Sequence, residues 1–72
     1  MTHFHINVFY SDDDQCWIAD IPDLRFCSAH GATAHEAVAE VEKARDAWLE
    51  VAREQGLPIP APHYRPAMPQ SA

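Results

Sequence analysis

The chain has 72 residues, of which 47% are hydrophobic, so it folds as one domain at most and is not wholly disordered. A chain of this size buries only roughly 60% of its unfolded surface, and small domains usually need a cross-link such as a disulfide or a metal ion, or a partner chain, for stability. Eleven acidic residues against five basic ones give a net charge of −6. That charge excludes a generic phosphate-binding surface, which needs clustered lysines and arginines.

The two cysteines, Cys16 and Cys27, do not have the spacing of a zinc-binding pair. Residues 1–5 lack the basic start and apolar run of a signal peptide. No stretch approaches the roughly 20 apolar residues that span a bilayer. We therefore expect a cytoplasmic protein with reduced thiols and no membrane contact, in which a homodimer supplies the missing stability.

Residues 4–10 alternate between apolar and polar side chains, which predicts a strand with one buried face. The polar residues 11–15 predict a hairpin loop, and residues 16–21 predict a second strand. Pro22 ends that strand, because proline cannot donate to a ladder. A third short strand is expected over residues 26–30, so the three strands form an antiparallel meander.

From Ala34 to Gln55 the spacing of the apolar residues changes to that of a helix. Thr33 and Glu36 have the spacing of a capping box at its start. Gly56 suits the left-handed residue after a helix, and Pro58 prevents continuation. At about 1.5 Å per residue the helix is long enough to lie across the whole sheet.

The expected fold class is therefore α+β, with a three-stranded antiparallel sheet and one long helix packed on one face. A short fourth strand is expected around residues 63–65. Five of the six prolines fall in residues 57–69, where alternating prolines favour an extended conformation. We predict a domain over residues 1–62 and a proline-rich tail over residues 63–72.

A recognisable series of residues runs from strand to helix over residues 17–37. Its members are Trp17, Pro22-Asp23-Leu24, Cys27, Gly31, Thr33 and Glu36-Ala37. Together with the exit at residues 56–62, their order and spacing resemble the HicB-like antitoxin family over roughly residues 4–62. That family commonly has Pro-Gly before the cysteine, where this chain has Arg25-Phe26. Phenylalanine adopts a positive φ only with strain, so the geometry of this turn is left open.

The resemblance implies a truncated ribonuclease-H-like fold. Many members bind a small HicA-type toxin, which cleaves mRNA, and cover its active site. The resemblance thus implies an antitoxin or orphan binding protein with no catalytic residue and no cofactor. Many members also carry a C-terminal DNA-binding domain, which we do not expect here, so no direct nucleic-acid binding is predicted. An acidic chain suits a small basic toxin, because complementary charges speed encounter.

Several residues are candidates for the surface that contacts a partner or a second copy. Two aromatic residues, Phe9 and Phe26, lie off the main apolar pattern. Trp17 is a candidate interface anchor, although packing in the core is its ordinary role. Asp12, Asp13 and Asp14 are candidate contacts for a basic partner, and their structural alternative is a solvated turn. The unpaired edges of a three-stranded sheet invite a dimer in which two copies join.

Two alternatives come from other functional classes. The histidines His3 and His5 share one face of the first strand, and His30 lies on another strand, so these three are candidate metal ligands. Their structural alternative is an exposed polar face. A degenerate nuclease ranks last, because Asp20 and Asp23 have no obvious acidic partner for a two-metal site.

Overall fold

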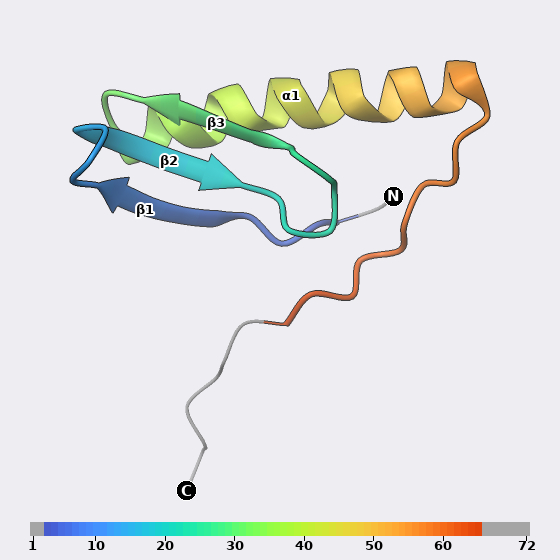
Figure 1. The fold of residues 1–72 in the computed structure, drawn as a ribbon, viewed down its shortest axis with the longest axis horizontal. Helices are drawn as coiled ribbons and strands as arrows, with labels where there is room; N and C mark the ends of the chain where they lie inside the picture. The colour runs from blue at the N-terminus through green and yellow to red at the C-terminus, as the bar shows by residue number, and fades with distance from the viewer. Residues whose placement is uncertain (1–2, 66–72) are drawn as a thin grey trace, which may run out of the picture.

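The computed structural model describes residues 3–65 and folds as a sheet with one long helix packed on it (Figure 1). The strands are β1 (Asn7–Ser11), β2 (Cys16–Asp20) and β3 (Ser28–Gly31), and the helix is α1 (Ala34–Gln55). The sheet is antiparallel in the order β1-β2-β3. The α+β class, the three-stranded meander and the single long helix are therefore confirmed.

The first strand is shorter than predicted, since β1 begins at Asn7 and not at residue 4. Phe4 and Ile6 still pack against the core, but from an irregular lead-in. Within β1, Val8 lies opposite the buried Ala19, so the face predicted to be buried does point towards the helix. It is only partly covered, because α1 lies mainly over β3 and β2.

The other two strands also differ from the prediction at the connection between them. β2 ends at Asp20, one residue early, and β3 begins at Ser28 rather than residue 26. Tight turns occupy the gap: the backbone N–H of Leu24 donates to Ile21 O at 3.1 Å, and that of Cys27 donates to Leu24 O at 3.3 Å. These turns take up residues that the sequence pattern had assigned to strands.

The helix bounds are confirmed, and Thr33 and Gly56 cap the helix as predicted, but the Glu36 carboxylate accepts from the N–H of Ala32 and not from that of Thr33, as a capping box would require. The Thr33 hydroxyl accepts a hydrogen bond from the Glu36 N–H at 3.1 Å, and the Glu36 carboxylate accepts from the Ala32 N–H at 3.3 Å. Gly56 has φ 67°, and its N–H donates to the carbonyls of Ala52 and Arg53. Local capping chemistry therefore determines both ends of α1.

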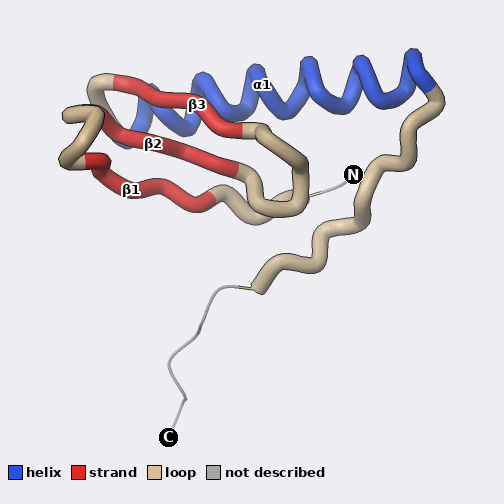
Figure 2. The backbone as a smooth tube through the Cα atoms, in the orientation of Figure 1, coloured by secondary structure: helices blue, strands red, loops and turns tan. Residues whose placement is uncertain are grey.

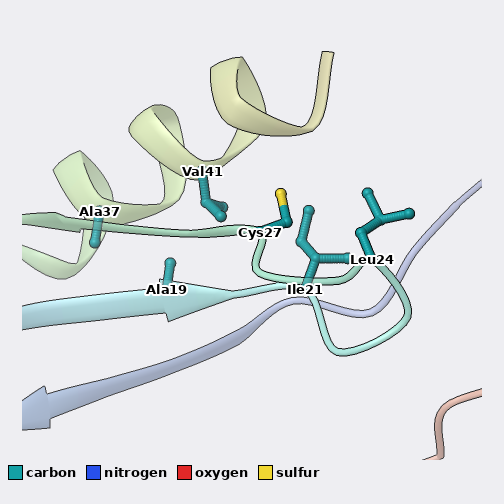
Figure 3. Close-up of a cluster of buried hydrophobic side chains, with 6 residues drawn as sticks. All are labelled: Ala19, Ile21, Leu24, Cys27, Ala37 and Val41. Carbon is teal, nitrogen blue, oxygen red and sulfur yellow. The ribbon is translucent and has the colours of Figure 1, made fainter. Parts of the chain in front are cut away.

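The core lies between the sheet and the N-terminal half of α1 (Figure 3). Its buried members are Ala19, Ile21, Leu24, Cys27, Ala37 and Val41. At Gly31 the strand approaches the helix so closely that an added Cβ would lie 2.7 Å from the Ala37 nitrogen. The helix has 22 residues, or about 33 Å, whereas a five-residue strand spans about 17 Å. The C-terminal half of α1 consequently extends past the strands (Figure 2).

The predicted fourth strand around residues 63–65 is wrong, because these residues form no strand. One side chain holds them instead: the Asp23 carboxylate accepts hydrogen bonds from the backbone N–H groups of His63 at 3.3 Å and Tyr64 at 3.1 Å. The prolines at every second position before them have no N–H for a ladder. The remaining part of the predicted tail, residues 66–72, lies outside the described residues.

Candidate functional site

A groove opens between the β2–β3 connection and the C-terminal half of α1, with a volume of about 390 Å³. We call it the Phe26 groove and define it by the residues Phe26, Cys27, Ala44, Trp48, Val51 and Leu57. Its lining side chains are all apolar, apart from the indole N–H of Trp48. It lies where α1 has extended past the sheet.

The groove exists because three of the helix residues that line it are alanines. Alanines at 44, 47 and 52 leave space above the helix backbone. Val51 is 46% exposed and Leu57 is 51% exposed, although both are apolar. The helical stripe predicted to face the core therefore continues into a segment where the sheet no longer covers it.

Phe26 is the most exposed large hydrophobic residue of the described chain, at 92%. Its φ is 57°, so the turn adopts the left-handed conformation even though the residue is not glycine. The indole N–H of Trp48 donates to the carbonyl of Arg25 at 3.0 Å, which ties this turn to the helix. The Arg25 guanidinium lies 5.6 Å from the centroid of the Phe26 ring. The fold thus holds an aromatic side chain in solvent beside an apolar groove.

Charged residues of both signs border the groove: Arg25 lies beside the Phe26 ring, and helical spacing places Lys43 beside Ala47 and Arg45 beside Trp48. Helical spacing places Glu50 beside Ala47 and Glu54 beside Val51, and both glutamates are exposed. Among the other acidic residues of α1, Glu40 pairs with Lys43 at 3.0 Å and Asp46 pairs with Arg45 at 3.1 Å, whereas Glu36 and Glu42 take part in no ion pair within residues 3–65. Within residues 3–65 no ion pair involves Glu50 or Glu54.

The predicted partner residues do not gather on one surface. Asp12, Asp13 and Asp14 lie in the β1–β2 hairpin, at the opposite end of the sheet from the β2–β3 connection (Figure 1). The Ser11 hydroxyl donates to the Asp14 carboxylate and accepts from the Asp14 N–H, both at 3.2 Å, so Asp14 stabilises the turn. Phe9 is 49% exposed and lies opposite Ile18 on the sheet face away from the helix.

Trp17 belongs to the helix-facing side of the sheet. It lies opposite Gly31 on β3 and packs edge-on against Tyr10, with ring centroids 5.6 Å apart. It is half-buried and contacts the core cluster. This environment favours the packing role of Trp17 over that of an interface anchor.

The three histidines named as metal candidates lie in different environments. His5 Nε2 is 2.7 Å from the Asn7 side-chain oxygen, and its ring packs on Tyr64 at 4.9 Å. His30 lies opposite Ile18 on the sheet face away from the helix. His3 lies beside the helix near Arg53. Within residues 3–65, no three histidine, cysteine or acidic side chains come together as a metal site.

The carboxylates considered for a nuclease have separate surroundings. Asp20 lies opposite Asn7 on one side and Ser28 on the other. The Asp23 side chain is 1% exposed and also contacts His63 Nδ1 at 2.8 Å, in addition to the two backbone N–H groups. Asp23 therefore stabilises the packing of the C-terminal segment, and these two carboxylates do not form the paired arrangement of a two-metal site.

The buried thiol of Cys27 lies on the inner side of the groove. Burial raises the pKa of Cys27, Arg45 lowers it in part, and Asp20 adds to the rise. The thiol form is therefore favoured, and a thiol reacts far less readily than a thiolate. In this environment Cys27 acts as a small apolar residue of the core.

Most residues of the groove, including Val51 and Leu57, are absent from the surface residues predicted from the sequence. One available signal was length, since a 22-residue helix cannot be covered by strands of about five residues. The role of Asp23 had no such signal, because its partners lie 40 and 41 residues further along the chain.

Comparisons with known proteins leave the chain without an assigned relative: no family model, curated protein or solved structure matches it. Among residues 3–65, α1 is too polar to cross a membrane, and no other helix is present.

Proposed function

We propose that this chain is a HicB-like antitoxin, or an orphan relative, that binds a small basic mRNA-cleaving protein and covers its active site. The observation that carries the proposal is the Phe26 groove, an apolar recess in a strongly acidic chain. The residue series from Trp17 to Ala37 supports the family resemblance. We include in the proposal a relationship to the ribonuclease-H-like fold, with which the β-β-β-α order is compatible.

Neutralisation would follow from binding alone. The negative charge of the chain attracts a basic protein and speeds encounter, and buried apolar contacts slow dissociation. A bound antitoxin occupies cationic groups that otherwise contact RNA phosphates, so RNA and antitoxin compete for one surface. This mechanism needs no catalytic residue and no cofactor in the chain.

The proposal includes a homodimer in the cytoplasm. β1 is an edge strand on which Val8, Phe9 and Tyr10 are all exposed. Exposed apolar edge strands favour pairing with another chain, and β1 has no proline or lysine to oppose it. The two cysteines are free, which agrees with a reducing compartment.

We expect a gene beside the one for this chain to encode a small basic protein, and the test is co-expression of that protein with the chain. We expect the two proteins to copurify, and the neighbour to cleave mRNA alone but not in the presence of an equimolar amount of the chain. Heat-denatured chain at the same concentration is the control. Equal RNA cleavage with and without the native chain would contradict the proposal.

A further inference from the structure

We propose that Cys16 and His30 form one half of a zinc site, and that a second copy of the chain, stacked on the open face of the sheet, supplies the other half. The open face is the side of the sheet away from α1, and it carries Phe9, Cys16, Ile18 and His30. The inference goes beyond the proposed function, because neither toxin binding nor the pairing of β1 edges needs a metal ion.

The strand register places Cys16 and His30 on one face of the sheet, on neighbouring strands. His30 lies opposite Ile18, and Cys16 comes two residues before Ile18 on β2, so all three side chains point away from the helix. They line a single hollow of about 440 Å³, together with Asp14 from the hairpin. Diagonal neighbours of this kind lie roughly 7 Å apart, a distance that one metal ion spans through a thiolate and an imidazole.

The thiol and the imidazole are both accessible and have no other bonding role in the described residues. Cys16 is a free cysteine that is half-buried, and His30 is exposed. Among residues 3–65, neither side chain takes part in a hydrogen bond or an ion pair. By contrast, Cys27 is buried in the core and His63 contacts Asp23. The open face therefore holds the cysteine and the histidine that a metal ion can reach.

Two ligands are too few for one chain to hold zinc alone. Over the described part of the chain, no group of three histidine, cysteine or acidic side chains is placed to hold a metal ion. Structural zinc takes four ligands in a tetrahedron, and two thiolates with two imidazoles are one of its usual sets. A two-fold axis through the metal ion turns Cys16 and His30 into that set, because both copies present the same residues. Binding releases the two thiol protons to solvent, since the ligand is the thiolate.

The apolar surface and the charge of the open face favour a second copy with a cation between the two. Phe9 lies opposite Ile18 and is 49% exposed, so stacking two copies would remove apolar surface of both from water. Stacked sheets lie about 10 Å apart, a gap that a metal ion bonded to side chains of both sheets can span. The strands β1, β2 and β3 contain no lysine or arginine, whereas Asp20 lies on this face. Two such acidic faces repel each other, and a Zn²⁺ ion between them offsets the repulsion.

The test measures metal binding by the full chain with Zn²⁺ and Co²⁺ as probes, in a phosphine reductant that keeps the thiols reduced. We expect isothermal titration calorimetry to give one Zn²⁺ per two chains. Co²⁺ in the same site should produce the near-ultraviolet charge-transfer absorption of a cobalt–thiolate bond. In analytical ultracentrifugation, the mass of the native chain in Zn²⁺ should be twice its mass in EDTA, whereas pairing of β1 edges is insensitive to EDTA.

Two pairs of variants locate the ligands. Cys16→Ala and His30→Ala should each weaken Zn²⁺ binding by more than about 100-fold, because loss of a direct ligand costs more than loss of a residue that only orients one. Cys16→Ala should also abolish the cobalt–thiolate absorption. The matched controls, Cys27→Ala and His5→Ala, remove the same types of side chain outside the hollow and should bind Zn²⁺ as the native chain does. Circular dichroism checks that all four variants fold.

Three outcomes would overturn the inference: no cobalt–thiolate absorption in the native chain, one Zn²⁺ per chain without a change in mass, or equal binding by Cys16→Ala and Cys27→Ala. The proposed function can fail separately. If the chain neutralises its neighbour equally well in Zn²⁺ and in EDTA and binds no metal, the function stands and the zinc site is wrong. If the chain binds zinc as expected and leaves RNA cleavage unchanged, the zinc site stands and the antitoxin role is wrong.

Discussion

Phe26 and Asp23 lie three residues apart in the β2–β3 connection, yet they have opposite environments. Asp23 is a charged residue that the fold buries, and Phe26 is an apolar residue that the fold exposes. The buried carboxylate is satisfied by backbone N–H groups, as buried charges require. The exposed ring lies beside the Arg25 guanidinium and at the edge of the Phe26 groove. The exposure of Phe26 is thus the observation from which a binding surface is inferred.

The backbone strain at Phe26 is testable by comparing two substitutions. We expect Phe26→Gly to be more stable than Phe26→Ala by about 1 kcal/mol, because only glycine adopts φ 57° without a steric cost. Urea unfolding followed by circular dichroism measures the free energy of unfolding of both variants. Equal stability of the two would show that the left-handed conformation at this position is not strained.

Cys27 makes the stability depend on pH in the alkaline range. Its pKa in the folded chain is raised by burial, so the unfolded chain loses the thiol proton first as pH increases. The stabilising contribution is therefore complete below pH about 8.5 and is lost as pH rises through the folded-state pKa. Between pH 8 and pH 10 we expect the native chain to lose more stability than Cys27→Ala. The assignment would be contradicted if the native chain and a Cys16→Ala control lost no more stability than Cys27→Ala over this pH range.

At the scale of elements, the length of α1 relative to the strands decides where the apolar stripe is covered. The first half of the helix packs on the sheet through Ala37 and Val41. The second half carries Val51 beyond the ends of the strands and leaves it half-exposed. The groove is the consequence of a long helix on a short sheet.

The C-terminal segment is attached to the sheet through Asp23, and a double-mutant cycle tests this attachment. Asp23→Ala should lower the free energy of unfolding of the full chain by about 1–3 kcal/mol, because it removes the acceptor of the His63 and Tyr64 N–H groups. In a chain truncated after Pro62, the same substitution should cost much less. Thermal unfolding of the four proteins supplies the comparison. An equal cost in both backgrounds would mean that Asp23 stabilises the turn alone.

At the scale of the whole molecule, two apolar surfaces remain uncovered in the described chain. One is the Phe26 groove, and the other is the edge strand β1 with Phe9 on the face away from the helix. They belong to different elements, so each can be covered independently of the other. A chain with this small a core gains most from such association.

Dimer formation through β1 leads to a prediction for Phe9. We expect the native chain to sediment as a dimer at micromolar concentration and Phe9→Glu to shift towards the monomer, because a buried unpaired carboxylate is costly. Phe26→Ala is the matched control and should leave the dimer unchanged. Analytical ultracentrifugation gives the masses. A monomeric native chain, or a dimer unaffected by Phe9→Glu, would exclude this interface.

The sequence alone determined the features that depend on neighbouring residues. Thr33 caps the start of the helix, Gly56 ends it, and the aromatic and β-branched residues of 16–21 predict the central strand, because these signals act over a few residues. The family resemblance, the toxin partner and the dimer also come from the sequence and stay predictions.

Only the tertiary structure determined which residues distant in the sequence contact one another, and which apolar residues stay exposed. Val51 is exposed because the strands that pack on the helix are too short to reach it, and their length is set elsewhere in the chain. The tertiary structure paired Asp23 with His63 and Tyr64 across 40 residues of sequence, and it placed Phe26 in the left-handed conformation through the turns around it. These are long-range effects of packing, and packing is what forms the groove.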